Sequence, residues 1–361
     1  MSNIGMTLDE LDTPFLWTDV AQLDANIQTV ADYFAAAGVG WRPHTKGVKT
    51  PAIAHKFIAA GALGITCAKL GEAEVMVAAG IREILIANQT VGPHKYRRLA
   101  ALQRQANVIA AVDDASTLPG LSAAALAAGV EIPLLVEVNG GMNRAGTEPG
   151  EATVELAHQI HNTPGLRLDG LMAWEGHTLA LPENERAAGI HKAIGLLLSS
   201  AEACRAVGLP VKIVSCGGSG TMTVTAHIPG ITEMQAGGAI FGDATYQRWH
   251  APTRSALFVR VVVSSRPAPD RIIVDAGWKT LPAWITQPVP IGVEGVVKVS
   301  MSAEHGTVAL DRPNDSLRVG DFIDFIVGYG DNTLCLHDEI VGVRDGRVEA
   351  IWPVSARGKL T

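Results

Sequence analysis

The chain has 361 residues, 47% of them hydrophobic and 18% charged, with a formal net charge of −7. This composition is typical of a compact folded protein and argues against disorder. There are 29 basic and 36 acidic residues with no basic stripe, so the pattern excludes a typical nucleic-acid-binding protein. No apolar run approaches the ~20 residues of a membrane span, and we expect no membrane segment.

The four cysteines and the N-terminus suggest a cytoplasmic protein. Cys67, Cys204, Cys216 and Cys335 are widely spaced and form no CxxC pair, which is typical of reduced thiols. Residues 1–12 are polar and acidic and lack the pattern of a signal peptide. The length exceeds what one hydrophobic core usually serves, so we expect a large domain and a smaller one.

Strand-like and helix-like segments alternate from Thr13 to Asp243. Eight short apolar or β-branched runs predict strands at residues 39–43, 63–67, 83–87, 107–112, 132–138, 166–174, 211–215 and 233–236. Between them, helical periodicity predicts helices at residues 21–37, 51–60, 71–79, 93–105, 150–162 and 183–206. Such alternation implies parallel strands joined by helical crossovers, which favours a (β/α)8 TIM-like barrel. A doubly wound open sheet is the alternative.

The pattern changes after Pro252. Short strands separated by turn residues are predicted at residues 256–264, 271–274, 293–299, 306–310 and 321–327. Asp345-Gly346 joins two further strands in a hairpin. We therefore predict an α/β barrel over residues 13–248 and a second, all-β domain formed by residues 1–12 and 249–361.

Lys46 is the first candidate catalytic residue. Active sites of such barrels lie at the C-terminal ends of the strands. Lys46 follows the first predicted strand, where an amine can act as a nucleophile. A solvated surface lysine is the plain alternative, and Lys49 is a rival for the same role.

Other strand ends carry residues suited to an anionic or planar ligand. The segment Ser215–Thr221 is rich in glycine and hydroxyl groups, as phosphate-binding loops are. Arg144 follows the fifth strand and can bind an anion or form a surface ion pair. The sixth strand ends at Trp174 and His177 follows it. Trp174 can flank a planar ring or simply pack at the barrel rim.

Together these segments resemble the D-threonine aldolase and D-serine dehydratase family. Its members are fold-type III pyridoxal-phosphate enzymes related to alanine racemase. The most specific match is the segment 42–49, Arg-Pro-His-Thr-Lys-Gly-Val-Lys, which looks like the family's RPHxKTHK. Gly47 and Val48 stand where that motif has threonine and histidine. The other matching segments are residues 64–67, 71–74, 143–146, 217–221, 235–237, 304–306, 352–354 and 356–358.

The resemblance implies roles for particular residues. Lys46 would bond pyridoxal 5'-phosphate covalently, and Arg144 would contact its phenolate oxygen. Its phosphate would be held by Gly218, Ser219 and Gly220. Trp174 stands where the family often has tyrosine near the pyridine nitrogen.

The resemblance also implies a divalent metal, Mn, Mg or Zn, in the second domain. Aldolases of the family supply His-x-Asp and the dehydratases His-x-Cys. Here the triplet is Tyr329-Gly330-Asp331, so Asp331 is the predicted ligand and a tyrosine replaces the histidine. His305 or His337 could substitute if the fold brings it close.

We therefore expect a lyase that cleaves β-hydroxy-D-amino acids to glycine and an aldehyde. Dehydration to a 2-oxo acid and ammonia, or racemisation, are the alternatives within the same pocket. A non-catalytic pyridoxal-phosphate carrier is a further alternative, but such barrels usually lack a β domain. The expected partners are a small amino-acid substrate and a second copy of the chain in a head-to-tail homodimer.

Overall fold

The computed structural model describes residues 3–361 and divides the chain into two compact units. The barrel unit comprises residues 31–46, 53–237 and 359–361. The β-rich unit comprises the chain up to residue 30, residues 47–52 and residues 238–358.

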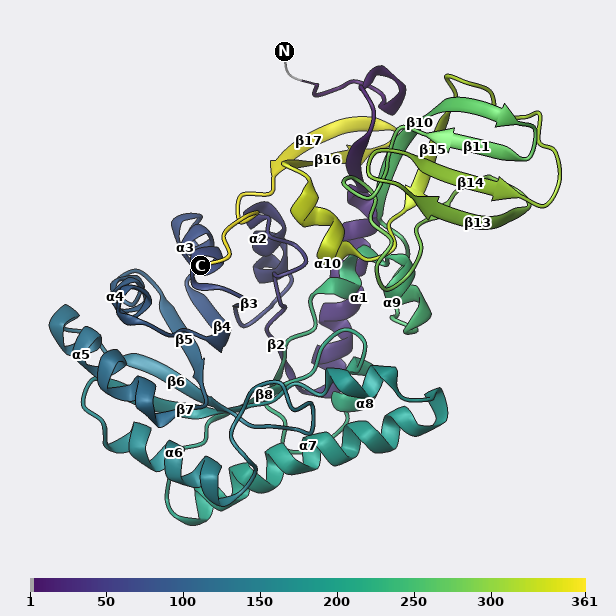
Figure 1. Ribbon diagram of the computed structural model, residues 1–361. Helices are drawn as coiled ribbons and strands as arrows, with labels where there is room; N and C mark the ends of the chain where they lie inside the picture. Colours follow the sequence, from purple (N-terminus) through teal and green to yellow (C-terminus); the bar gives the residue numbers. More distant parts are fainter. Residues whose placement is uncertain (1–2) are drawn as a thin grey trace. The chain divides into compact units, whose positions relative to one another are not determined.

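The barrel unit is built on eight parallel strands (Figure 1). They are β2 (Gly40–Trp41), β3 (Ile65–Cys67), β4 (Glu83–Gln89), β5 (Asn107–Val112), β6 (Ile132–Glu137), β7 (Leu166–Met172), β8 (Ile213–Cys216) and β9 (Glu233–Met234). Their order is β2-β9-β8-β7-β6-β5-β4-β3, and a parallel bridge between His44 and Thr66 joins the two ends of this row. The closed sheet confirms the predicted barrel and excludes the open doubly wound sheet.

Helices cover the outside of these strands (Figure 1). They are the second half of α1 (Val20–Ala37), α2 (Pro51–Ala59), α3 (Leu70–Ala78), α4 (Pro93–Leu102), α5 (Leu118–Ala128), α6 (Glu151–Asn162), α7 (Glu183–Ala206) and α8 (Met222–Thr225). Helix α6 shows how they pack, since its buried residues Thr153, Leu156, Ala157 and Ile160 recur at helical spacing. Proline begins α2 and α4, where a missing backbone N–H costs no helical hydrogen bond.

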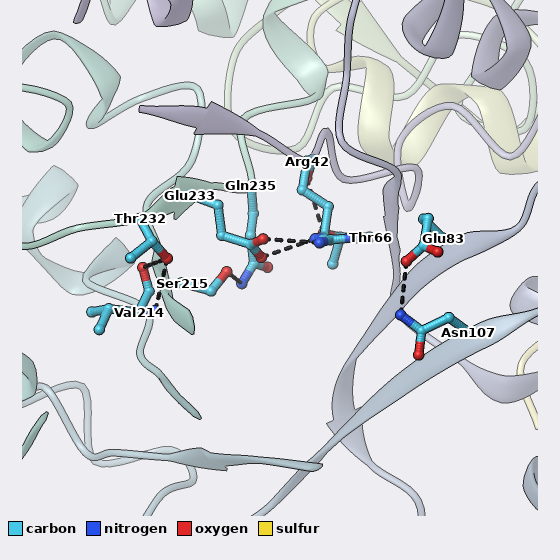
Figure 2. Close-up of polar contacts among 9 residues, drawn as sticks. All are labelled: Arg42, Thr66, Glu83, Asn107, Val214, Ser215, Thr232, Glu233 and Gln235. Atoms are coloured by element: carbon cyan, nitrogen blue, oxygen red, sulfur yellow. Dashed lines mark hydrogen bonds and ion pairs between the residues drawn. The ribbon is translucent and has the colours of Figure 1, made fainter. Parts of the chain in front are cut away.

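A buried ion pair crosses the inside of the barrel. Arg42, after β2, donates two hydrogen bonds of 2.9 Å to the carboxylate of Glu233 on β9. Figure 2 shows the two groups facing each other, with the amide of Gln235 bound to the Ser215 hydroxyl nearby at 3.0 Å. Gly64 leaves room for Arg42, because a methyl group there would lie 2.7 Å from its Nη1. Polar groups therefore fix the register of β2, β8 and β9.

The β-rich unit holds a nine-stranded sheet. Its strands are β1 (Phe15–Asp19), β10 (Leu257–Ala268), β11 (Arg271–Val274), β12 (Val289–Pro290), β13 (Val296–Met301), β14 (Gly306–Leu310), β15 (Phe322–Ile326), β16 (Glu339–Arg344) and β17 (Arg347–Pro353). The long strand β10 pairs with β1, β11 and β15, all antiparallel. Asp345 and Gly346 have φ of 50° and 75°, as the predicted hairpin between β16 and β17 requires.

Short helical segments complete the two units. They are α9 (Ala244–Arg248), α10 (Gly330–Thr333) and the 3-10 turns η1 (Leu8–Glu10), η2 (Ala115–Thr117), η3 (Gly176–Ala180), η4 (Gly238–Phe241) and η5 (Leu334–Leu336). Within residues 3–361, no helix is both long and apolar enough to span a bilayer. All four cysteines are free thiols.

Candidate active site

The segment that precedes Lys46 is held by buried hydrogen bonds. The backbone N–H of Thr45 donates to the carbonyl of Thr66 at 2.7 Å, and its hydroxyl donates to Oε1 of Glu72 at 2.7 Å. Glu72 is fully buried near the start of α3 and also accepts from the N–H of Ala68 at 3.0 Å. Lys46 itself is exposed. A fixed backbone therefore carries an accessible lysine side chain at the C-terminal end of β2.

Three of the predicted site residues meet in the barrel unit. Nζ of Lys46 lies 5.9 Å from the centroid of the Trp174 ring. The same ring packs against Gly218, where a methyl group would lie 2.6 Å from Cη2 of the tryptophan. These residues follow β2, β7 and β8, so the parallel strands bring them to one end of the barrel.

Lys49, the rival of Lys46, lies in a different environment. It belongs to the β-rich unit, is buried, and adopts a left-handed φ of 53°. Its carbonyl accepts a hydrogen bond of 3.0 Å from the N–H of Ala356. The two lysines that the sequence left as alternatives thus differ in exposure.

The glycine loop after β8 rests on a buried carboxylate. Glu175 accepts hydrogen bonds from the hydroxyls of Thr221 at 2.7 Å and Thr225 at 2.8 Å, and from the N–H of Gly217 at 3.2 Å. Burial raises the pKa of Glu175, and these hydrogen bonds act in the opposite direction. Sequence reasoning gave Glu175 no role. The available signal was an acidic residue directly after the apolar run Leu171–Trp174 at the end of the sixth predicted strand.

The groups in the barrel unit fit pyridoxal phosphate. Lys46 offers an amine, Trp174 an aromatic face, and the segment 217–221 a loop of small residues in which Ser219 is buried. Glycine at position 218 is required by the Trp174 ring, and Gly217 has a left-handed φ of 76°. Nδ1 of His177 is buried with no hydrogen-bond partner among the described residues, so it remains available to a bound ligand.

Arg144 contacts a carboxylate at the end of β6. Its Nη2 lies 3.5 Å from Oε1 of Glu137, and its side chain is 54% exposed. Glu137 also accepts a hydrogen bond of 2.5 Å from the amide of Gln89. Burial raises the pKa of Glu137, while Gln89 and Arg144 lower it. The structure places Arg144 at the expected end of the barrel, and its contact with a phenolate oxygen stays a prediction.

Asp331 lies in an aromatic cluster of the β-rich unit. The Tyr246 hydroxyl donates to Oδ1 of Asp331 at 3.3 Å. The ring of Tyr329 lies with its centroid 5.8 Å from that of Tyr246, 6.4 Å from Trp249 and 6.2 Å from Trp284. Burial raises the pKa of the Tyr329 hydroxyl, and the charge of Asp331 adds to this effect. The phenol is therefore neutral at physiological pH.

A second carboxylate, that of Asp243, binds the backbone of two residues in or next to this cluster. Asp243 is fully buried and accepts hydrogen bonds from the N–H groups of Tyr246 at 2.9 Å and Gly330 at 2.6 Å. Burial raises the pKa of Asp243 to about 8, and the charge of Asp331 contributes. Sequence reasoning missed Asp243, whose signal was its position as the N-cap of α9.

The residues around Asp331 do not fit a divalent metal site. Nε2 of His337 is 2.8 Å from the carbonyl of Thr280 and must carry a proton to donate to it. His305 is exposed between β13 and β14. Throughout residues 3–361, the His, Cys, Asp and Glu side chains form no group of three able to hold a metal.

Comparisons with known families cover both parts of the chain. The family described as "Alanine racemase, N-terminal domain" matches residues 18–245. The family described as "Putative serine dehydratase domain" matches residues 256–343.

Individual relatives match over nearly the full length. A D-threonine aldolase from Arthrobacter sp. is 37% identical over 98% of this chain and 95% of its own. A 3-hydroxy-D-aspartate aldolase from Paracoccus denitrificans (strain Pd 1222) is 35% identical over 98% of this chain and 94% of its own. The crystal structure of D-threonine aldolase from Filomicrobium marinum superposes with a TM-score of 0.95 at 37% identity, covering 100% of both chains.

Proposed function

The chain belongs to the family of D-threonine aldolases and D-serine dehydratases, and we propose that it is a pyridoxal-phosphate-dependent lyase that cleaves β-hydroxy-D-amino acids. The products are glycine and an aldehyde. The match to two aldolases over 98% of the chain supports this reaction over the alternatives. The substrates are small amino acids.

One observation carries the proposal: the amine of Lys46 faces the Trp174 ring, and that ring packs on the glycine loop. In the proposed site, Lys46 would bond the cofactor covalently, and Trp174 would pack against it. Gly218, Ser219 and Gly220 would hold its phosphate, and Arg144 would contact its phenolate oxygen. The contact with Glu137 can orient the guanidinium of Arg144 for this role.

The chemistry divides between cofactor and protein. Bound pyridoxal phosphate supplies an electron sink for the pair of electrons left on the α-carbon when a bond to it breaks. The protein's share is to bind, orient and move protons. Glu175 fixes the loop at residues 217–221, and the buried contacts of Thr45 fix the backbone that carries Lys46.

The proposal is tested by product analysis. The purified holoenzyme is incubated with a panel of β-hydroxy-D-amino acids and their L-enantiomers, and glycine, aldehyde, 2-oxo acid, ammonia and enantiomeric composition are measured together. We expect glycine and aldehyde in equal amounts, from the D-enantiomers only. If none of these amino acids is converted, the proposed substrate class is refuted.

The assignment of Lys46 is tested with a matched pair of variants. Lys46→Ala should abolish the absorbance of covalently bound cofactor together with activity. Lys49→Ala removes a lysine three residues away and should retain the covalent bond. If Lys46→Ala kept that absorbance and Lys49→Ala lost it, the two roles would be exchanged.

Dehydration is the second candidate, because residues 256–343 match the serine dehydratase domain. In that reaction Nζ of Lys46 would remove the α-proton and the β-hydroxyl would leave with a proton as water. Hydrolysis of the dehydrated product would then give a 2-oxo acid and ammonia. These products would identify the dehydratase, and inversion without cleavage would identify a racemase.

We further propose that the enzyme is a cytoplasmic homodimer. The resemblance to enzymes that pair head to tail supports the dimer, and the four free thiols suit a reducing compartment. Light scattering after gel filtration tests the first statement, and cell fractionation the second. A monomeric mass for the active enzyme would contradict the dimer.

A further inference from the structure

Two departures from the family motif meet at one place in the β-rich unit. Position 47, threonine in the family's RPHxKTHK, is glycine, and position 329, histidine in its metal triplet, is tyrosine. A methyl group on Gly47 would lie 2.7 Å from Cγ of Asp331 and closer still to its Oδ1. Contacts that short are not tolerated, so the carboxylate of Asp331 occupies space that a side chain at position 47 would fill.

Asp331 is held in this space by a hydrogen bond. The donor is the hydroxyl of Tyr246, 3.3 Å from Oδ1. Tyr246 is buried and in turn depends on Gly238, where a methyl group would lie 2.6 Å from Cε2 of the tyrosine ring and closer to its hydroxyl. One carboxylate oxygen of Asp331 is thus already an acceptor, and the tyrosine that donates to it is fixed by packing.

Tyr329 cannot replace the missing imidazole. Its side chain is buried among Tyr246, Trp249 and Trp284. A phenol is neutral near pH 7 and offers a poor oxygen ligand, whereas a metal-binding histidine offers an unprotonated nitrogen. His337 offers no replacement through Nε2, which donates to Thr280.

We propose that Gly47, Tyr246, Tyr329 and Asp331 form a metal-free version of the family's metal site, and that the lyase needs no divalent cation. Tyr246 and the space at Gly47 position Asp331, and the phenol of Tyr329 stands in place of the imidazole. The claim that catalysis needs no cation rests on the function proposed above. The claim that these four residues bind no cation is independent of that function and is tested without any substrate.

The experiment is a titration of chelator-treated holoenzyme with Mn²⁺, following free Mn²⁺ by electron paramagnetic resonance. The wild type, Tyr329→His, Tyr329→Phe and the double variant Gly47→Thr/Tyr329→His are compared. We expect no saturable binding by the wild type or by Tyr329→Phe. The double variant, which regains an imidazole and loses the space that Asp331 now fills, should bind one Mn²⁺ per chain. Tyr329→His alone should bind more weakly than the double variant.

The outcomes separate the parts of the proposal. Saturable Mn²⁺ binding by the wild type that disappears in Asp331→Ala would overturn the proposal. This comparison does not depend on whether the double variant folds. Binding that survives Asp331→Ala would lie outside these four residues, and it would overturn metal independence if activity also fell with chelator. If Tyr329→His and the double variant bound Mn²⁺ with equal affinity, the role of Gly47 would be refuted. If the double variant did not bind Mn²⁺, positions 47 and 329 would not account for the loss of the metal site.

Activity gives an independent measurement. If the enzyme cleaves β-hydroxy-D-amino acids, we expect the same rate with chelator, without it, and with added Mn²⁺. A rate that falls with chelator and returns with Mn²⁺ would overturn metal independence. If no substrate is cleaved, the proposed function fails while the titration still decides whether the site binds a cation.

Discussion

The carboxylate of Glu175 lies 2.7 Å from the hydroxyl of Thr221 in the glycine loop after β8, and both residues are fully buried. The same carboxylate accepts from Thr225 and from the N–H of Gly217. One side chain, three residues after the end of β7, therefore contacts both ends of the loop that we assign to the cofactor phosphate.

Glu175→Ala should destabilise the barrel unit and weaken phosphate binding. The substitution leaves two buried hydroxyls and one N–H without their acceptor, which we expect to cost about 3 kcal/mol. Urea unfolding measures the stability, and competition by inorganic phosphate against cofactor binding measures the affinity. Glu202→Ala is the control, since Glu202 is exposed on α7 and its pair with Arg205 contributes little. Equal effects of the two variants would contradict the role of Glu175.

Replacing one member of the ion pair inside the barrel should lower the free energy of unfolding more than replacing both members. Arg42→Met or Glu233→Leu alone leaves one buried charge unpaired, for which we expect a loss of about 3 to 5 kcal/mol. The double variant Arg42→Met/Glu233→Leu removes both charges and should be more stable than either single variant. Urea unfolding of all four proteins completes the cycle. Additive losses would show that the two side chains act independently.

The barrel could be predicted from the sequence because its elements are local. All eight strands of the barrel unit were predicted, with boundaries that differ by a few residues. Helix α5 was missed, since residues 118–128 are mostly alanine and leucine and show no polar face. Strand β1 was missed because Phe15–Asp19 is short and its partners β10 and β16 come from the other end of the chain.

The candidate site could be predicted only where it follows from strand ends. Lys46, Trp174 and Gly218 meet because parallel strands end together. The partners of Glu175 lie 46 and 50 residues away, and no local pattern marks such a pair. The contact between Gly47 and Asp331 depends on packing between segments from opposite ends of the sequence, which periodicity does not encode.

Gly218→Ala should displace the Trp174 ring, because the added methyl group would lie 2.6 Å from that ring. We expect a changed tryptophan fluorescence spectrum and weaker cofactor binding. Gly195→Ala is the matched control. Gly195 is exposed in α7 with no atom within 4 Å of an added methyl group, so the change should stabilise the helix by up to about 1 kcal/mol. Unaltered fluorescence and affinity in Gly218→Ala would show that the ring does not need this glycine.

Asp243 should make the stability of the β-rich unit depend on pH. Burial raises the pKa of Asp243 from 3.8 to about 8, so the folded protein holds this proton more tightly than the unfolded chain does. The resulting contribution to stability is complete below the ordinary pKa and is lost as pH rises through about 8. Between these limits the slope should reach about 1.4 kcal/mol per pH unit.

Asp243→Asn removes this titration while keeping one acceptor for the N–H groups of Tyr246 and Gly330. Urea unfolding of both proteins at about pH 5, about pH 7 and about pH 9 gives the difference in unfolding free energy at each pH. We expect the wild type to lose stability relative to Asp243→Asn from the lowest pH to the highest, with little further change above about pH 8. A difference that stayed constant with pH would mean that Asp243 is ionised in the folded protein throughout this range. Its two backbone hydrogen bonds would then outweigh the cost of burying the charge.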